Sequence, residues 1–200
     1  MTDDPIRAAY DEWTRGRDPV AARVALYERV RDLPFRYPSG RSAGEVLAQG
    51  GGSCSGKHAL LAALFRHAGL PVRHMLCTHR FNDWPMAFPD DLQALLQKNE
   101  IVDVHDYLQV CIDGAWVDVD ATWPLALREF GLTSEEWDGR SSMVLSVVSD
   151  EHEELDSEPG KAKEERLSKL TPRQRMLRKQ FLERLSQWAN ELLAEAAQDR

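Results

Sequence analysis

The strongest constraint on this chain is a short stretch in which glycines lead into a helix that carries a cysteine in its first turn. Residues 51–74 read GGSCSGKHALLAALFRHAGLPVRH. The glycines allow a tight turn, and the side chain of Ser53 is a candidate cap for the N–H groups of the helix start. Apolar residues recur at helical spacing until Gly69 and Pro71 end the helix, and residues 72–77 are expected to form a strand.

Cys54 occupies the start of this helix, where free N–H groups and the helix macrodipole favour negative charge. The pKa of a thiol in such a position is lowered, which increases the fraction of thiolate, the form that attacks acyl groups. A single cysteine at a helix start is more often a small core residue. The functional interpretation therefore depends on a base and a carboxylate elsewhere in the chain.

Composition limits the class of protein. The chain has 200 residues, 42% of them hydrophobic, and a net charge of -8, which predicts one domain with an appendage. The acidic balance argues against a nucleic-acid partner, and we find no apolar run of membrane length and no export signal. Three cysteines without CxxC spacing are typical of a reducing compartment, so we expect a cytoplasmic protein that does not bind membranes.

A β-hairpin is predicted in the middle of the chain. Residues 102–112 and 115–120 are rich in β-branched and aromatic residues, and Asp113-Gly114 between them is a strong signal for a two-residue turn. Because side chains alternate along a strand, this turn fixes which residues share a face.

The hairpin register brings a histidine close to a carboxylate. If Ile112 pairs with Ala115, His105 lies opposite Thr122. Asp120 is then within diagonal reach of the His105 ring. A thiol, an imidazole and a carboxylate suit nucleophilic catalysis, in which the imidazole takes the thiol proton and the carboxylate orients the ring.

The remaining elements follow from apolar periodicity and end signals. We expect helices over residues 18–32, 42–49, a short one from about 90, 133–137 and 171–197, and a further strand over 143–148. The long connection 79–100 carries aromatic residues that either line a substrate groove or pack on the core. We divide the chain into a domain (1–148), a charged, solvated linker (149–170) and an amphipathic C-terminal helix (171–200), which docks on the domain or pairs with a partner protein or a second copy.

Other site assignments remain open. Asp118 shares a strand face with Asp120 and is a rival for the orienting carboxylate, while Gln49 is either an amide donor near the thiol or a solvated side chain. Cys54 and His58 have i, i+4 spacing, but the chain offers no second pair with zinc-ligand spacing. We read His58 and Lys57 as groups flanking the thiol or as helix surface, and we expect neither a metal nor a cofactor.

Two blocks of the sequence resemble the transglutaminase-like superfamily of cysteine enzymes. The first is GGSCSGKHALLAALFRHAGLPVRHM, and the second is HDYLQVCIDGAWVDVDATW, in which a histidine opens a strand and a hairpin leads to an Asp-Ala-Thr run. Together with the upstream LPFRY, the resemblance covers roughly residues 18–123.

The resemblance implies an α+β, papain-like transglutaminase core, in which the helix bearing Cys54 packs on an antiparallel sheet that carries His105 and Asp120. It also implies attack of the thiolate on a protein, peptide or small amide substrate, with the backbone N–H of Cys54 as one oxyanion donor. Peptidase or amidase action is expected rather than cross-linking. The alternatives are acyl transfer as in arylamine N-acetyltransferases, or a binding module that retains the fold.

Overall fold

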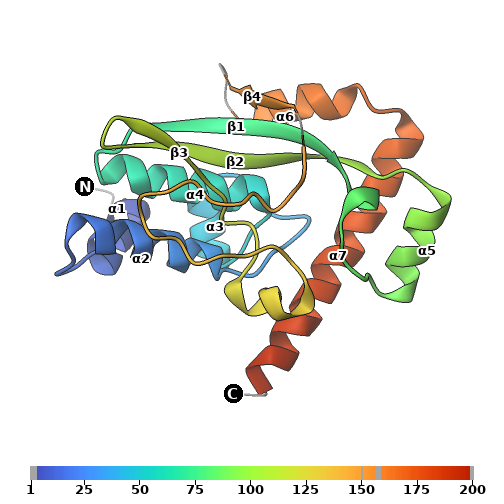
Figure 1. Cartoon of the computed structure of the whole chain (residues 1–200), viewed down its shortest axis with the longest axis horizontal. Helices are drawn as coiled ribbons and strands as arrows, with labels where there is room; N and C mark the ends of the chain where they lie inside the picture. The colour runs from blue at the N-terminus through green and yellow to red at the C-terminus, as the bar shows by residue number, and fades with distance from the viewer. Residues whose placement is uncertain (1–3, 150, 156–158, 199–200) are drawn as a thin grey trace.

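A four-stranded antiparallel sheet forms the centre of the structure, with strand order β3-β2-β1-β4 (Figure 1). The computed structural model describes residues 4–149, 151–155 and 159–198. The strands are β1 (Val72–Arg80), β2 (Val102–Ile112), β3 (Ala115–Val119) and β4 (His152–Glu154). The helices are α1 (Pro5–Trp13), α2 (Pro19–Arg31), α3 (Ala43–Gln49), α4 (Cys54–His67), α5 (Asp90–Lys98), α6 (Pro159–Ser168) and α7 (Pro172–Gln198), with short 3-10 helices η1 (Phe81–Asp83) and η2 (Leu125–Phe130). This combination is the α+β fold expected from the sequence.

Helix α4 packs against β1 and β2, and α1, α2 and α3 contact α4 in turn. It begins at Cys54 as predicted and is followed by Gly69, whose φ of 76° is the left-handed conformation that commonly ends a helix. The apolar part of its buried face is formed by fully buried side chains, Leu60, Leu61, Ala62, Leu64 and Phe65. Burial of each leucine contributes about 2 kcal/mol, which holds the cysteine-bearing end of α4 in place. Ser53 stands at the N-cap position, but its side chain makes no capping hydrogen bond.

The β2–β3 hairpin has the predicted register, with Ile112 opposite Ala115. Asp113 and Gly114 both adopt positive φ, 51° and 85°, as a tight two-residue hairpin turn requires. The local turn signal was therefore sufficient to align the two strands.

The helix expected over residues 133–137 is wrong, and groups inside its capping-box pattern, which runs from Thr133 to Glu136, make tertiary contacts instead. The Ser134 hydroxyl donates to the carbonyl oxygen of Trp123 at 2.7 Å. The carbonyl oxygen of Glu135 accepts from the Tyr27 hydroxyl at 2.8 Å. Residues 132–138 are consequently irregular.

The strand expected over residues 143–148 is also wrong. The segment is irregular, and its backbone contacts the hairpin at separate points: the Met143 N–H donates to the Asp118 carbonyl, and the Ser146 N–H donates to the Asp120 carboxylate. Met143 and Val147 are buried, and the Asp120 carboxylate takes the place of a strand partner.

Residues 149–170, expected as a solvated linker, contain a strand and a helix. The strand β4 pairs antiparallel with β1, and α6 lies against β2. Most of the α6 surface is polar, yet Lys163 is only 4% exposed. Low apolar content therefore did not mean that the segment lacks contacts with the domain.

Helix α7 begins with the predicted capping box, in which the Thr171 hydroxyl and the Gln174 side chain bond to each other's backbone N–H groups. It packs against α5, η2 and β2, through apolar residues that include Phe181, Leu182 and Leu185 (Figure 1). This is the docked arrangement of the two that the sequence left open. No helix in the described ranges is long and apolar enough to cross a membrane.

Candidate active site

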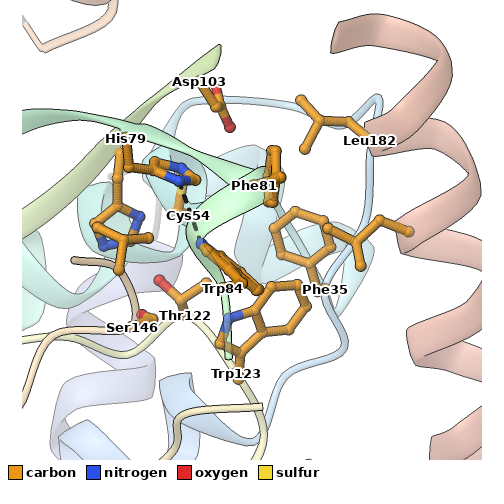
Figure 2. A pocket seen from close by; sticks show the side chains of 13 residues that line it. Phe35, Cys54, His79, Phe81, Trp84, Asp103, Thr122, Trp123, Ser146 and Leu182 are labelled. Atoms are coloured by element: carbon orange, nitrogen blue, oxygen red, sulfur yellow. Dashed lines mark hydrogen bonds between the residues drawn. The ribbon is translucent and has the colours of Figure 1, made fainter. Parts of the chain in front are cut away.

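Cys54 lies between two small pockets. It is 7% exposed and lines both of them. The first pocket also holds His105 and has a largely aromatic and aliphatic wall, formed by Phe35, Phe81, Trp84, Trp123, Val147, Leu182 and Leu185 (Figure 2). The second pocket is more polar and is lined on one side by the C-terminal helices, through Lys163, Arg178 and Leu182. The connection 79–100 thus contributes an aromatic wall through Trp84.

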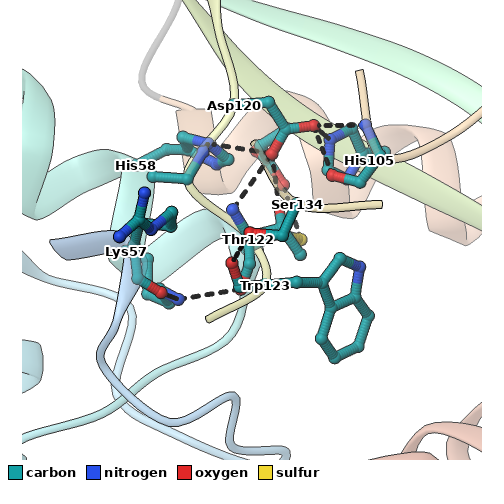
Figure 3. A network of polar contacts seen from close by, with 12 residues as sticks. Lys57, His58, His105, Asp120, Thr122, Trp123 and Ser134 are labelled. Atoms are coloured by element: carbon teal, nitrogen blue, oxygen red, sulfur yellow. Dashed lines mark hydrogen bonds and ion pairs between the residues drawn. The ribbon is translucent and has the colours of Figure 1, made fainter. Parts of the chain in front are cut away.

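The structure brings His105 and Asp120 together as the hairpin register predicted. His105 Nε2 lies 2.8 Å from Asp120 Oδ2, and both side chains are buried (Figure 3). Since Nε2 is bonded to the carboxylate, Nδ1 is the ring nitrogen left for the thiol of Cys54. Cys54 and His105 both line the first pocket.

Asp120 is held by hydrogen bonds at both carboxylate oxygens. Oδ1 accepts from the backbone N–H of Thr122 at 3.1 Å and from its hydroxyl at 2.7 Å. Oδ2 accepts from the backbone N–H of Ser146 at 2.8 Å and from its hydroxyl. Burial alone would raise the pKa of Asp120, but the charge and hydrogen bond of His105 outweigh it and hold this pKa well below the usual range.

The same contacts change the titration of the other two groups. Burial opposes the charged form of His105, yet the Asp120 carboxylate and the nearby thiol raise its pKa well above the usual value. Burial likewise opposes the thiolate of Cys54, but the cations Lys163 and His105 lower its pKa. The pair therefore favours a thiolate beside an imidazolium.

Two charged residues at the thiol were not predicted. Lys163 Nζ lies 3.4 Å from Cys54 Sγ and 2.6 Å from Asp106 Oδ2. Nothing in the sequence distinguished Lys163 from the solvated lysines around it. For Asp106 the available signal was its position next to His105 in a predicted strand, although alternation assigns neighbouring residues to opposite faces.

Lys57 and His58 are not helix surface, because both are fully buried, and their polar atoms bond to backbone groups. The Lys57 ammonium donates to three backbone carbonyls at 2.8 Å each, those of Arg31, Leu33 and Thr122 (Figure 3). His58 Nε2 accepts from the N–H of Ala121. Both side chains therefore fasten α4 to the segment that carries Asp120.

The rival assignments find no support in the geometry. Asp118 Oδ1 accepts from the side chain of Gln109 at 3.0 Å, and Asp118 lines neither pocket at Cys54. Gln49 accepts from the Gly40 N–H and likewise lines neither pocket. Within the described residues no group of three or more His, Cys, Asp or Glu side chains could hold a metal ion.

Comparison with known families decides the relationship. Residues 8–121 match the family model of the transglutaminase-like superfamily, and this range includes Cys54, His105 and Asp120. The chain belongs to this superfamily. Transglutaminase-like proteins form a family of cysteine-dependent hydrolases and acyltransferases, so the cysteine chemistry suggested by the sequence fits the family.

One solved structure similar to this transglutaminase-like chain is a protein from Cytophaga hutchinsonii described as a "Putative Cysteine Protease". The two share 19% sequence identity with a TM-score of 0.45. The alignment covers 78% of this chain and 52% of that protein, so the chain spans about half of its length. No curated protein matches the sequence.

Proposed function

We propose that this transglutaminase-like chain is a thiol hydrolase or acyltransferase that acts on amide or peptide carbonyls, as a peptidase or amidase rather than a cross-linking enzyme. The observation that carries the proposal is the placement of Cys54 at a helix start, in one pocket with His105, whose Nε2 is bonded to Asp120 at 2.8 Å. These three side chains are assigned as nucleophile, general base and acid, and orienting carboxylate.

The proposed reaction proceeds through a thioester. The Cys54 thiolate attacks the carbonyl carbon of the amide, and the His105 imidazolium gives its proton to the departing amine nitrogen as the C–N bond breaks. The neutral imidazole then takes a proton from water, which attacks the thioester; the C–S bond breaks, the carboxylic acid is released, and the Cys54 thiolate beside the imidazolium is restored. An amine in place of water would give acyl transfer. Asp120 keeps its negative charge throughout, which steadies the imidazolium.

Two N–H groups are candidate donors to the oxyanion. The backbone N–H of Cys54 belongs to the free donors of the first helical turn. The second is Trp123 Nε1, a buried atom that has no hydrogen-bond partner in the described part of the protein. The Trp123 ring lines the pocket that contains Cys54 (Figure 2), and a buried N–H without a partner is costly unless a ligand accepts from it.

The pockets also bear on substrate shape. His105 lines the apolar pocket and not the polar one. Because His105 protonates the departing amine, we assign the leaving group to the apolar pocket. Trp84 and Phe81 in its wall then favour an apolar or aromatic group on the amine side of the amide.

The test is the pH dependence of iodoacetamide alkylation, followed for each cysteine by mass spectrometry, in the wild type and in His105→Ala. We expect Cys54 to react fastest near neutral pH and to lose this reactivity when His105 is removed, because the imidazolium stabilises the thiolate. Cys77 is an internal control, since burial raises the pKa of its thiol to about 11. His67→Ala, at the other end of α4, is the matched control and should behave like the wild type.

If Cys54 reacts no faster than Cys77 and Cys111 at any pH, or if His105→Ala leaves its pH profile unchanged, the proposed chemistry is wrong. The binding module that retains the fold then becomes the better interpretation.

A further inference from the structure

Helix α6 places an ammonium group directly against the candidate nucleophile. Lys163 Nζ lies 3.4 Å from Cys54 Sγ, although the two residues are 109 positions apart in the chain. The lysine side chain is buried and its position is defined by two further contacts, to Asp106 Oδ2 at 2.6 Å and to Ser55 Oγ at 3.0 Å. The three N–H donors of the ammonium thus have three acceptors.

The acceptors of Lys163 are themselves fixed. The Ser55 hydroxyl donates to Asp106 Oδ2 at 2.6 Å, so Ser55 and Asp106 form one side of a closed polar cluster. Asp106 is 2% exposed, and burial, which opposes its charge, is outweighed by the Lys163 ammonium, so the pKa of Asp106 is lowered. The cluster therefore holds an ion pair beside the sulfur, with the Lys163 ammonium 3.4 Å and the Asp106 carboxylate 3.7 Å from Cys54 Sγ.

We propose that Lys163 is a further catalytic residue, whose ammonium is a second counter-ion for the Cys54 thiolate beside the imidazolium of His105. It keeps its proton during the reaction and moves no charge itself. Its effect is electrostatic, because a cation close to a sulfur in a site with little water favours the thiolate over the thiol. The proposal rests on the proposed role of Cys54 as nucleophile.

Charged and titratable groups from several neighbouring elements line the two pockets at the thiol or interact with its charge. They are Lys57 of α4, Cys77 and His79 of β1, Asp103, His105 and Asp106 of β2, Lys163 of α6 and Arg178 of α7. Several are already compensated: Asp103 is paired with Arg178 at 2.6 Å, and Lys57 is held by backbone carbonyls. Lys163 is the largest of the influences that lower the pKa of Cys54, and the Asp106 charge opposes it.

Lys163 lies outside the matched family region, whereas its partners Cys54, Ser55 and Asp106 lie inside it. The match ends at residue 121, and α6 begins at Pro159. In this chain, therefore, a helix outside the family core completes the surroundings of the nucleophile.

The experiment compares the pH midpoint of Cys54 alkylation in Lys163→Met, Lys163→Arg and Lys161→Met. The midpoint is used instead of the alkylation rate, because a different side chain at residue 163 also changes how easily iodoacetamide reaches the thiol, which alters the rate at every pH. We expect Lys163→Met to raise the midpoint by at least about one pH unit, which is about a tenfold loss of thiolate below the midpoint. Lys163→Arg keeps the charge and should stay near the wild type. Lys161 is exposed on the same helix, so its variant is the matched control.

A wild-type midpoint in folded Lys163→Met would overturn the proposal and leave the lysine as a cover of the site. In that case a shifted midpoint in His105→Ala would show that the proposed function stands without it. If Lys163→Met does not fold, His105→Ala decides alone. In His105→Ala, where Lys163 is still in place, the alkylation midpoint of Cys54 should stay below about 9. Burial raises the pKa of Cys77 to about 11, and a Cys54 midpoint near that value would refute Lys163 as a second counter-ion.

Discussion

His58 Nε2 accepts a hydrogen bond of 2.9 Å from the backbone N–H of Ala121, so the helix that begins at Cys54 is bonded to the residue that follows Asp120. The neighbouring Lys57 reaches the same segment through the carbonyl of Thr122. Nucleophile and carboxylate are thus parts of one frame, although they lie in separate stretches of the chain. The geometry of the candidate site depends on these buried polar contacts as well as on apolar packing.

Replacement of His58 by alanine should destabilise the protein and disturb the site. It leaves the Ala121 N–H buried without its acceptor and opens a cavity, and we expect a loss of about 2–4 kcal/mol in the free energy of unfolding. Urea denaturation measures this loss. His67→Ala should change it by no more than about 0.5 kcal/mol. Equal stability of the two variants would mean that the His58 contact does not hold the segment.

Replacement of Cys54 by alanine should abolish turnover and leave the fold nearly intact. The side chain lost is small, so the free energy of unfolding should change by about 1 kcal/mol or less. Loss of the nucleophile should lower kcat by at least about 10⁴-fold. Circular dichroism and an amidase assay on a substrate found by screening measure the two effects. Full activity in this variant would refute the thioester mechanism.

Asp120→Asn should lower stability most between about pH 5 and pH 6.5. The pKa of Asp120 is lower in the folded than in the unfolded protein. Its carboxylate therefore stabilises the fold at pH above the unfolded-state pKa, and this stabilisation is lost as pH falls through the folded-state pKa. The pKa of His105 is higher in the folded than in the unfolded protein. Its imidazolium therefore stabilises the fold at pH below the unfolded-state pKa, and this stabilisation is lost as pH rises through the folded-state pKa. Urea denaturation of the wild type and of Asp120→Asn across pH measures the difference between their free energies of unfolding. This difference should become smaller toward low and toward high pH. A difference independent of pH would show that no charged pair forms.

Trp123→Phe tests the second oxyanion donor. The indole N–H is lost while most of the ring remains, so turnover should fall by about 100-fold and the alkylation midpoint of Cys54 should not move. Turnover is measured with a chromogenic anilide that the wild type cleaves, and the alkylation midpoint of Cys54 is measured by mass spectrometry. Unchanged turnover would assign the second donor elsewhere.

Trp84→Ala tests the apolar pocket. We compare the rate at which Cys54 reacts with N-phenyl-iodoacetamide to its rate with iodoacetamide. The ratio of these two rates should be about five- to tenfold lower in the variant than in the wild type, because the aromatic contact is removed. The ratio of the two alkylation rates is insensitive to a general loss of reactivity. Trp116→Ala, at an exposed tryptophan on β3, should keep the wild-type ratio. A ratio unchanged in Trp84→Ala would mean that the probe does not enter this pocket.

Local signals predicted the parts of the site that are built from neighbouring residues. The glycines before Cys54 and Gly69 after α4 marked the helix, and the Asp113-Gly114 turn set the register that places His105 beside Asp120. These features depend on backbone conformation and strand alternation, which a single sequence displays directly.

Contacts between distant charged groups were not predictable in this way. Lys163 and Asp106 meet across 57 positions, and their charges look the same in the sequence whether they are solvated or buried. The capping-box pattern from Thr133 to Glu136 failed for a related reason, since the Ser134 hydroxyl inside it bonds to the distant Trp123 carbonyl. Periodicity describes which face is apolar and carries no information about such pairings.

The order of the chain has a consequence during synthesis. Cys54, His105 and Asp120 leave the ribosome before Lys163, which follows the cysteine by 109 positions. Protein segments made first generally begin to fold first. On the assignment of Lys163 as counter-ion, a nascent transglutaminase-like core would carry a less acidic thiol than the finished protein, and the arrival of α6 would be the step that brings the cysteine to full reactivity.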